Sequence, residues 1–114
     1  MKSLKIIILI AITILTLQSC SKDDDTTNTV DVYVAGYERN ETTRIAKLWK
    51  NGEVTNLTDG TNDAIAYDVY VSGEDVYVVG YESEAGKEIA KIWKNGVPTN
   101  LTDGTNRAIA FDIH

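Results

Sequence analysis

Two aspartates that could take part in acid–base chemistry stand 44 residues apart in nearly identical surroundings. Asp68 ends the string "AIAYD" and Asp112 ends "AIAFD". Two carboxyl groups held at a defined separation can hydrolyse a glycosidic bond, one as acid and the other as base or nucleophile. A repeat also generates such pairs by symmetry, and an inner-strand aspartate often accepts hydrogen bonds from backbone N–H groups. The pattern favours this structural role, so no catalytic residue is predicted.

Aromatic residues recur with the same spacing. Trp49 and Trp93 occupy equivalent positions, and Tyr67 and Tyr70 flank the first aspartate. Aromatic rings on a surface can stack on sugars, but at strand positions they more often pack between sheets, where each buries about 150–250 Å². Packing is favoured for the two tryptophans, and the choice stays open for the tyrosines. The candidate ligand-binding residues are therefore Trp49, Trp93, Tyr67, Tyr70, Asp68 and Asp112.

Other chemistry finds little support. The loop Asp59 to Asp63 has alternating oxygen-bearing side chains, as calcium loops do, but the second copy places Arg107 where Asp63 stands in the first. Turn hydrogen bonds explain the loop better than a metal ion. His114 is the only histidine, and no phosphate-binding glycine loop is present. We expect no metal, no cofactor and no enzyme activity.

The front of the chain has the pattern of a bacterial export signal. Two lysines precede an apolar run of twelve residues, 6–17, which as a helix would be about 18 Å long and too short for a membrane core of about 30 Å. The next residues, "LQSC", resemble the lipobox of bacterial lipoproteins. The resemblance implies that residues 1–19 are a signal peptide and that Cys20 becomes the lipidated N-terminus, a stable membrane anchor.

Residues 20–30 contain no large apolar side chain before Val30, and Asp23, Asp24 and Asp25 are consecutive. Such a composition predicts a solvated tether. An acidic cluster behind the lipidated cysteine resembles the signal that sends lipoproteins of some Gram-negative bacteria to the exterior of the outer membrane. Solubility alone would also select these acids, so both explanations remain open.

Charge and size limit the partners. Without residues 1–19, the chain has 95 residues and a net charge of −8. Phosphates would repel such a surface, which argues against nucleic acid. Cys20 is the only cysteine, so no disulfide within the chain can form.

A repeat organises the rest of the chain. Residues 31–70 and 75–114 align without a gap and share 26 of 40 positions. A period of 44 residues is typical of propeller blades, each a four-stranded antiparallel sheet. Runs rich in β-branched and aromatic residues predict strands at 64–72, 75–82, 88–94 and 97–102. Asn-Gly pairs at 51–52 and 95–96 predict tight hairpins.

The pattern resembles the propeller-type repeats of bacterial surface and secreted proteins, which implies an all-β fold with repeats at 31–74 and 75–114. On this count residues 31–58 supply three strands, and 108–114 supply one inner strand that could complete them. Two blades do not close a ring, which typically takes about four to eight. The chain could be a fragment of a longer gene, which we favour, a homo-oligomer whose copies complete the ring, or a small two-sheet unit.

Together these features predict a lipid-anchored lipoprotein of the outer membrane, facing the exterior. Its β-module would bind an extracellular glycan, peptide or protein, or serve as a scaffold. The alternatives are a carbohydrate-active enzyme, or the remnant of one, using Asp68 and Asp112, and a truncated fragment without a function of its own.

Overall fold

The computed structural model describes residues 29–114. The predicted signal peptide, the lipidation of Cys20 and most of the tether therefore lie outside the described residues. Residues 31–114 form one compact unit, and all regular structure in the described part is β-strand. The prediction of an all-β fold is confirmed.

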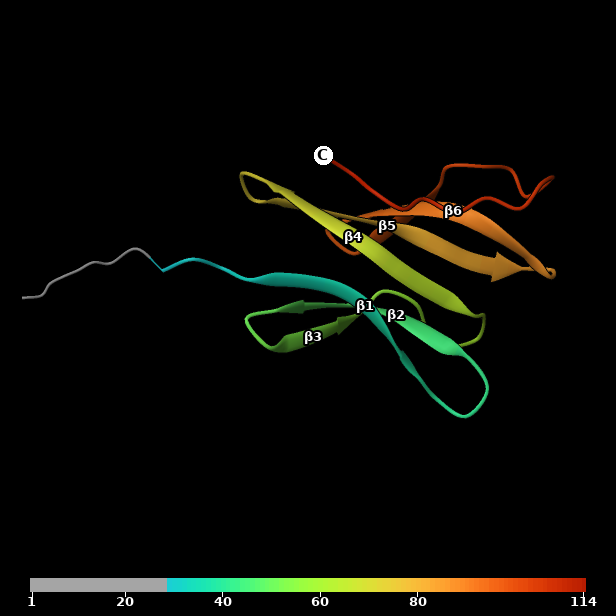
Figure 1. Ribbon diagram of the computed structural model, residues 1–114, viewed down its shortest axis with the longest axis horizontal. Coiled ribbons are helices and arrows are strands. Elements are labelled where there is room, and N and C mark those ends of the chain that lie inside the picture. The colour runs from blue at the N-terminus through green and yellow to red at the C-terminus, as the bar shows by residue number, and fades with distance from the viewer. Residues whose placement is uncertain (1–28) are drawn as a thin grey trace, which may run out of the picture. The chain divides into compact units, whose positions relative to one another are not determined.

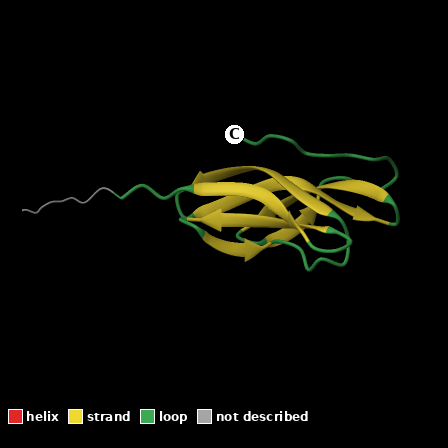
Figure 2. Ribbon diagram, turned by 60° about the horizontal axis from the view of Figure 1, so that its bottom comes forward, coloured by secondary structure: helices red, strands yellow, loops and turns green. Residues whose placement is uncertain are grey.

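Seven strands form two antiparallel sheets, as Figures 1 and 2 show. Sheet A has the strand order β1-β2-β3, and sheet B has the order β4-β5-β6-β7. In Figure 1 the two sheets lie one above the other, and the C-terminal segment runs along sheet B on the side away from sheet A. The strands are β1 (Tyr33–Arg39), β2 (Arg44–Lys50), β3 (Glu53–Asn56), β4 (Ala64–Ser72), β5 (Asp75–Glu84), β6 (Lys87–Lys94) and β7 (Val97–Asn100).

The sequence repeat is also a repeat of strand pairing. Val34 lies opposite Trp49 between β1 and β2, and Val78 lies opposite Trp93 between β5 and β6. All pairs of β1-β2-β3 recur 44 residues later in β5-β6-β7. Because a slip of one residue would turn every side chain to the opposite face, this shared register gives equivalent residues equivalent faces.

The Asn-Gly hairpins form as predicted. Asn51 and Asn95 both have φ of 51°, and the glycines that follow have φ of 86° and 85°. Positive φ at both central positions is the geometry of a type I′ turn. The Asn51 side chain also accepts a hydrogen bond from Val32 N at 2.8 Å, and Asn95 does the same for Val76 N at 2.9 Å. Each turn is thereby tied to the start of a neighbouring strand.

The other hairpin differs between the repeats. In the first, Asn40 Oδ1 accepts hydrogen bonds from the backbone N–H groups of Thr42 and Thr43, at 2.9 and 2.7 Å. In the second, Ala85 and Gly86 turn the chain with positive φ. The two loops reach the same strand register by different local chemistry, because this loop has no sequence in common between the copies.

The junction between the sheets forms the core. Its buried side chains come from both sheets and from the loop after β3: Ala46, Leu57, Ala64, Ala66, Val78 and Trp93. Strand β4 pairs with β5 beside Gly80, where an added Cβ would lie 1.9 Å from the Ile65 carbonyl oxygen. No side chain fits in that space, so this glycine allows β4 to approach β5.

The C-terminal segment differs from the expectation. Residues 108–114 have the sequence of an inner strand but form no strand, and they do not complete sheet A. Instead Ala108 N donates to Glu88 O at 2.9 Å, and Ala110 N donates to Gly80 O at 3.3 Å. The segment lies on sheet B, which directly precedes it in the sequence. Among the described residues it forms no ladder with a strand.

The two tryptophans provide a matched test of this core. Trp93 is fully buried at the junction, whereas Trp49 is half-buried on the outer face of sheet A. We expect Trp93→Ala to lower the free energy of unfolding by about 3–5 kcal/mol, and Trp49→Ala to lower it by less than half as much. Urea unfolding at low protein concentration would measure both, and equal losses would contradict the assigned core.

Candidate functional site

The predicted aromatic residues separate into core and surface. Trp93 is fully buried, so it cannot contact a ligand and belongs to the packing. Trp49 is half-buried, with its ring edge 3.1 Å from the position of a Cβ on Gly36. Tyr67 and Tyr70 are exposed on β4. The structure thus leaves the two tyrosines as the most accessible rings among the candidates.

Tyr67, Asp68, Phe111 and Asp112 form a cluster that we call the inner-edge cluster. The ring centroids of Tyr67 and Phe111 are 4.9 Å apart, with the planes tilted by 51°. Asp68 Oδ2 accepts a hydrogen bond from Ile113 N at 3.0 Å, which ties β4 to the C-terminal segment. Three of the six candidate residues, one of them from the second repeat, therefore meet at one place.

A bulge in β4 shapes this cluster. The pairing of β4 with β5 shifts between Ala66 and Asp68, so Tyr67 has no partner residue in the ladder. Bulges of this kind redirect a side chain and bend the strand. The extra residue lets Tyr67 reach Phe111. Tyr70, beyond the bulge, instead packs its ring 6.5 Å from that of Tyr77.

The Asp68 carboxylate is engaged by hydrogen bonds. The backbone N–H of Ile113, then a side-chain hydrogen bond with Asp112, hold the pKa of Asp68 below its usual value. Oδ1 accepts a further bond from Val69 N at 2.9 Å. A carboxylate stabilised in this way is a poor general acid, since that role requires a raised pKa. The arrangement suits recognition of a hydrogen-bond donor better than hydrolysis.

Beside the cluster, Asp112 Oδ2 lies 3.4 Å from Nδ1 of the exposed His114. Phe111 and His114 were not candidates in the sequence. The repeat alignment held the signal for Phe111, since it occupies the position equivalent to Tyr67.

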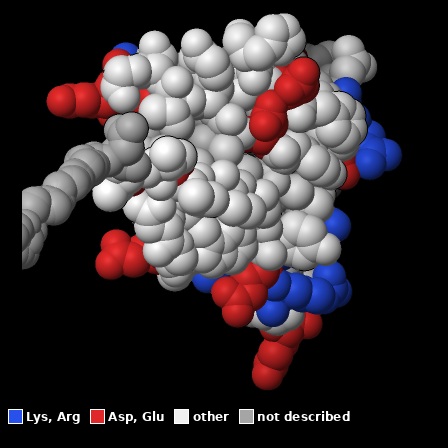
Figure 3. Space-filling model, turned by 60° about the vertical axis from the view of Figure 1, so that its left-hand side comes forward, with Lys and Arg blue, Asp and Glu red and all other residues white. Residues whose placement is uncertain are grey.

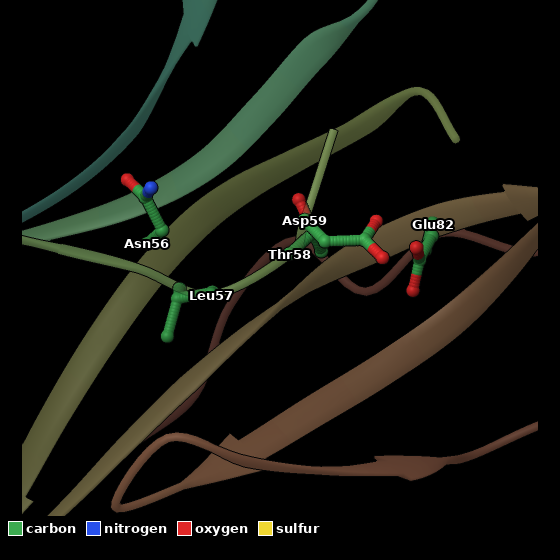
Figure 4. A pocket seen from close by; sticks show the side chains of 5 residues that line it. All are labelled: Asn56, Leu57, Thr58, Asp59 and Glu82. Carbon is green, nitrogen blue, oxygen red and sulfur yellow. The ribbon is translucent and has the colours of Figure 1, made fainter. Parts of the chain in front are cut away.

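A hollow of about 520 Å³ opens between the loop after β3 and strand β5. Figure 4 shows the Asp59 carboxylate directed toward Glu82 across it. Both acids are already engaged: Glu82 by Lys91 Nζ at 2.5 Å, and Asp59 by Thr61 N at 2.9 Å. Within residues 29–114 no group of three or more His, Cys, Asp or Glu side chains is gathered to hold a metal ion.

The loops that resemble calcium sites are fastened by ion pairs. In the first repeat, Arg44 on β2 binds Asp63 through its Nε, at 2.9 and 3.1 Å, and through its NH2 group. In the second repeat the charges are exchanged, and Arg107 binds Glu88 from the equivalent positions. We call these pairs the clasps. Each joins the second strand of a repeat to the segment that follows the third strand, and the sequence alone showed only the difference between Asp63 and Arg107.

The first clasp shifts the ionisation of its members. The Arg44 hydrogen bond, against the opposing effect of burial, holds the pKa of Asp63 below its usual value and raises that of Arg44. Tyr81 completes the group, since Arg44 NH2 donates to its hydroxyl oxygen at 3.1 Å. Burial raises the pKa of Tyr81, so this hydroxyl stays protonated at neutral pH.

Exchanging the charges of the first clasp tests its contribution. Arg44→Glu alone places two acids together, and Asp63→Arg alone places two guanidinium groups together. We expect each single change to destabilise the fold, and the double change, which recreates the pair of the second repeat, to recover more than half of the loss. The coupling between the two sites should be about 1–2 kcal/mol, because both side chains are partly exposed.

Chemical denaturation of the four chains would measure this coupling as a function of pH. Since the folded pKa of Asp63 lies below the unfolded value, its stabilisation is complete above the unfolded pKa of about 4 and is lost as the pH falls through the folded pKa. A double variant no more stable than either single variant would show that the two side chains do not interact.

Two further findings concern membranes and relatives. No helix among residues 29–114 is both long and apolar enough to cross a membrane.

Comparison of the chain with models of protein families, with characterised proteins and with solved structures finds no match.

Proposed function

We propose that this protein is a lipoprotein of the outer membrane, facing the exterior and held by lipid on Cys20. Its repeats are propeller-type modules that bind an extracellular glycan, peptide or protein. The "LQSC" motif and the three aspartates behind it support the anchor and its location. The negative charge and the exposed inner-edge cluster support a binding role outside the cell.

The observation that carries the binding role is the exposed ring pair of Tyr67 and Phe111 next to two carboxyl groups. Rings supply a flat apolar surface for a sugar face or a peptide side chain. Asp112 is exposed and can accept hydrogen bonds from hydroxyl or amide groups. A ligand rich in hydrogen-bond donors, such as a neutral glycan, matches these groups best.

Hydrolysis by Asp68 and Asp112 is the second candidate, because the structure brings the two carboxyl groups together. Retaining glycosidases hold their carboxyl groups about 5–5.5 Å apart, with the sugar between them. Here both oxygens of Asp68 accept hydrogen bonds from backbone N–H groups, Oδ1 from Val69 and Oδ2 from Ile113. A carboxylate held in this way favours binding without turnover.

Glycan and peptide arrays probed with the full chain in detergent would test the binding role. We expect Tyr67→Ala to weaken binding at least fivefold through loss of the ring contact, and Asp112→Asn to weaken it less. Val54→Ala, an exposed apolar change on β3, is the control. Binding that Tyr67→Ala leaves unchanged would exclude the inner-edge cluster, and turnover abolished by Asp68→Asn would favour the enzyme.

The anchor is tested separately. Mass spectrometry of the mature protein from its native membrane should find Cys20 as the N-terminus with diacylglycerol and acyl additions. Cys20→Ser should abolish the additions and release the protein from membranes. An unmodified cysteine, or cleavage at another position, would contradict the lipoprotein assignment.

A further inference from the structure

Equivalent residues of the two repeats differ sharply in burial. Val34 is 51% exposed and its counterpart Val78 is 1% exposed; Tyr37 is 46% exposed and Tyr81 only 4%. In the segments that follow β7 and β3, Leu101 is 52% exposed and its counterpart Leu57 is 8% exposed. Val34, Tyr37 and Leu101 are therefore exposed counterparts of residues that are buried elsewhere in the same chain.

Tyr81 shows how the junction between the sheets is filled. Its ring lies 6.3 Å from that of Tyr67, its residue pairs with Ile65, and its hydroxyl meets the first clasp. The residues around it are Arg44 on β2, Asp63 just before β4, and, on the neighbouring strand β4 itself, Ile65 and Tyr67. Tyr81 is thus a side chain from sheet B enclosed by the clasp and by the inner strand.

The same surroundings recur at the C-terminal segment without a tyrosine in them. A hollow of about 310 Å³ is lined by Glu88, Arg107, Ala108, Ile109 and Phe111. Four of these are the counterparts, 44 residues on, of the residues around Tyr81. The counterpart of Tyr81 itself is Tyr37, which lies exposed on sheet A of the same chain.

The contrast between Gly36 and its counterpart Gly80 also indicates that a strand is missing beside β1. At Gly80 an added Cβ would meet the β4 backbone, 1.9 Å from Ile65 O and 2.9 Å from Ala66 Cα. At Gly36 an added Cβ would meet only the Trp49 ring, at 3.1 and 3.8 Å, and its φ is not positive. No backbone atom of residues 29–114 requires a glycine here, but a strand pairing with β1 as β4 pairs with β5 would require one.

We propose that the chain associates head to tail with a second copy of itself. Tyr37 of one copy fills the hollow beside Glu88 and Arg107 of the other, and residues 108–114 of that other copy pair with the free edge of β1. The ladder of β4 with β5 fixes the register: Ile109 lies opposite Tyr37, Ala110 opposite Gly36, and Ile113 opposite Val34. The C-terminal segment becomes a strand in this contact.

A second copy fits this surface for physical reasons. The Tyr37 side chain and the hollow beside Glu88 and Arg107 are complementary, because their counterparts already pack against each other within the chain. Figure 3 shows a broad area without charged side chains on one face of the molecule, with both acidic and basic side chains around its margin. The centres of protein interfaces are similarly depleted of charged residues. Because the contacting surfaces differ, the association is heterologous and continues from copy to copy until a ring closes.

Disulfide trapping in the full-length chain tests the proposal. The chain with both Val34→Cys and Ile113→Cys places the new cysteines opposite each other across the contact, at a spacing that suits a disulfide. Mild oxidation should give a ladder of covalent oligomers reaching beyond the dimer. Each single variant should form no covalent oligomer on oxidation, which also controls for Cys20.

Two changes in the double-cysteine chain test the geometry. Tyr37→Ala empties the hollow and Gly36→Ala blocks the pairing strand, and each should reduce the ladder at least tenfold. Neither should shift the midpoint of thermal unfolding by more than a few degrees at low protein concentration. Val97→Ala should leave the ladder intact, since its counterpart Glu53 stays exposed at the internal junction.

Three outcomes would overturn the proposal: no ladder in the double-cysteine chain, a crosslink confined to one chain, or a ladder that Tyr37→Ala and Gly36→Ala leave unchanged. A dimer formed by Val34→Cys alone would indicate a symmetric contact instead. The readout involves neither lipid nor ligand, so its failure is distinguishable from failure of the proposed function.

Discussion

The close approach of β4 to Gly80 is the contact on which the rest of the fold depends. With the Ile65 carbonyl in the space of a Cβ, the inner strand lies close enough to β5 to pair along its whole length. That pairing carries the chain from sheet A into sheet B and encloses Trp93 and Val78 between them. An isolated three-stranded meander of this size has little apolar surface to bury, so the two sheets stabilise each other.

The two repeats show that similar sequences give the same strand pairing but need not give the same burial. Trp49 and Trp93 share strand, register and facing partner, yet one is half-buried and the other is fully enclosed. The difference comes from the neighbouring sheet, which exists for Trp93 and is absent from the described residues for Trp49. Burial is a property of the packed layers, so similar strings of residues can lie in different environments.

The parts that sequence analysis predicted correctly are those decided by local chemistry. The Asn51 and Asn95 turns follow from the requirement for positive φ, and the alternation of β-branched and aromatic residues marks the strands. The sequence analysis did not predict features that depend on how the strands pair. Residues 108–114 have strand-forming side chains but no partner strand, and Ala85 adopts positive φ because Gly86 and the strand register require a two-residue turn.

The candidate site was predicted only in part for the same reason. Tyr67, Asp68 and Asp112 are accessible or near the surface and come together, because the bulge in β4 and the bond from Ile113 bring the inner strand and the C-terminal segment into contact. Trp93 was a candidate by residue type alone, and its burial depends on the opposite sheet. A residue's type suggests what it could bind, whereas access depends on layers that the sequence does not define.

The exchanged charges of the clasps determine which segment docks on which sheet. Arg44 attracts Asp63 and would repel Arg107, while Glu88 attracts Arg107 and would repel Asp63. If the C-terminal segment lay beside Arg44 in place of Asp63 and β4, two guanidinium groups would meet, and the displaced Asp63 would lie beside Glu88, which brings two acids together. Like charges at contact distance are unfavourable, most of all where partly buried. Two copies of one motif are thereby kept from exchanging segments, although their inner-strand sequences are nearly the same.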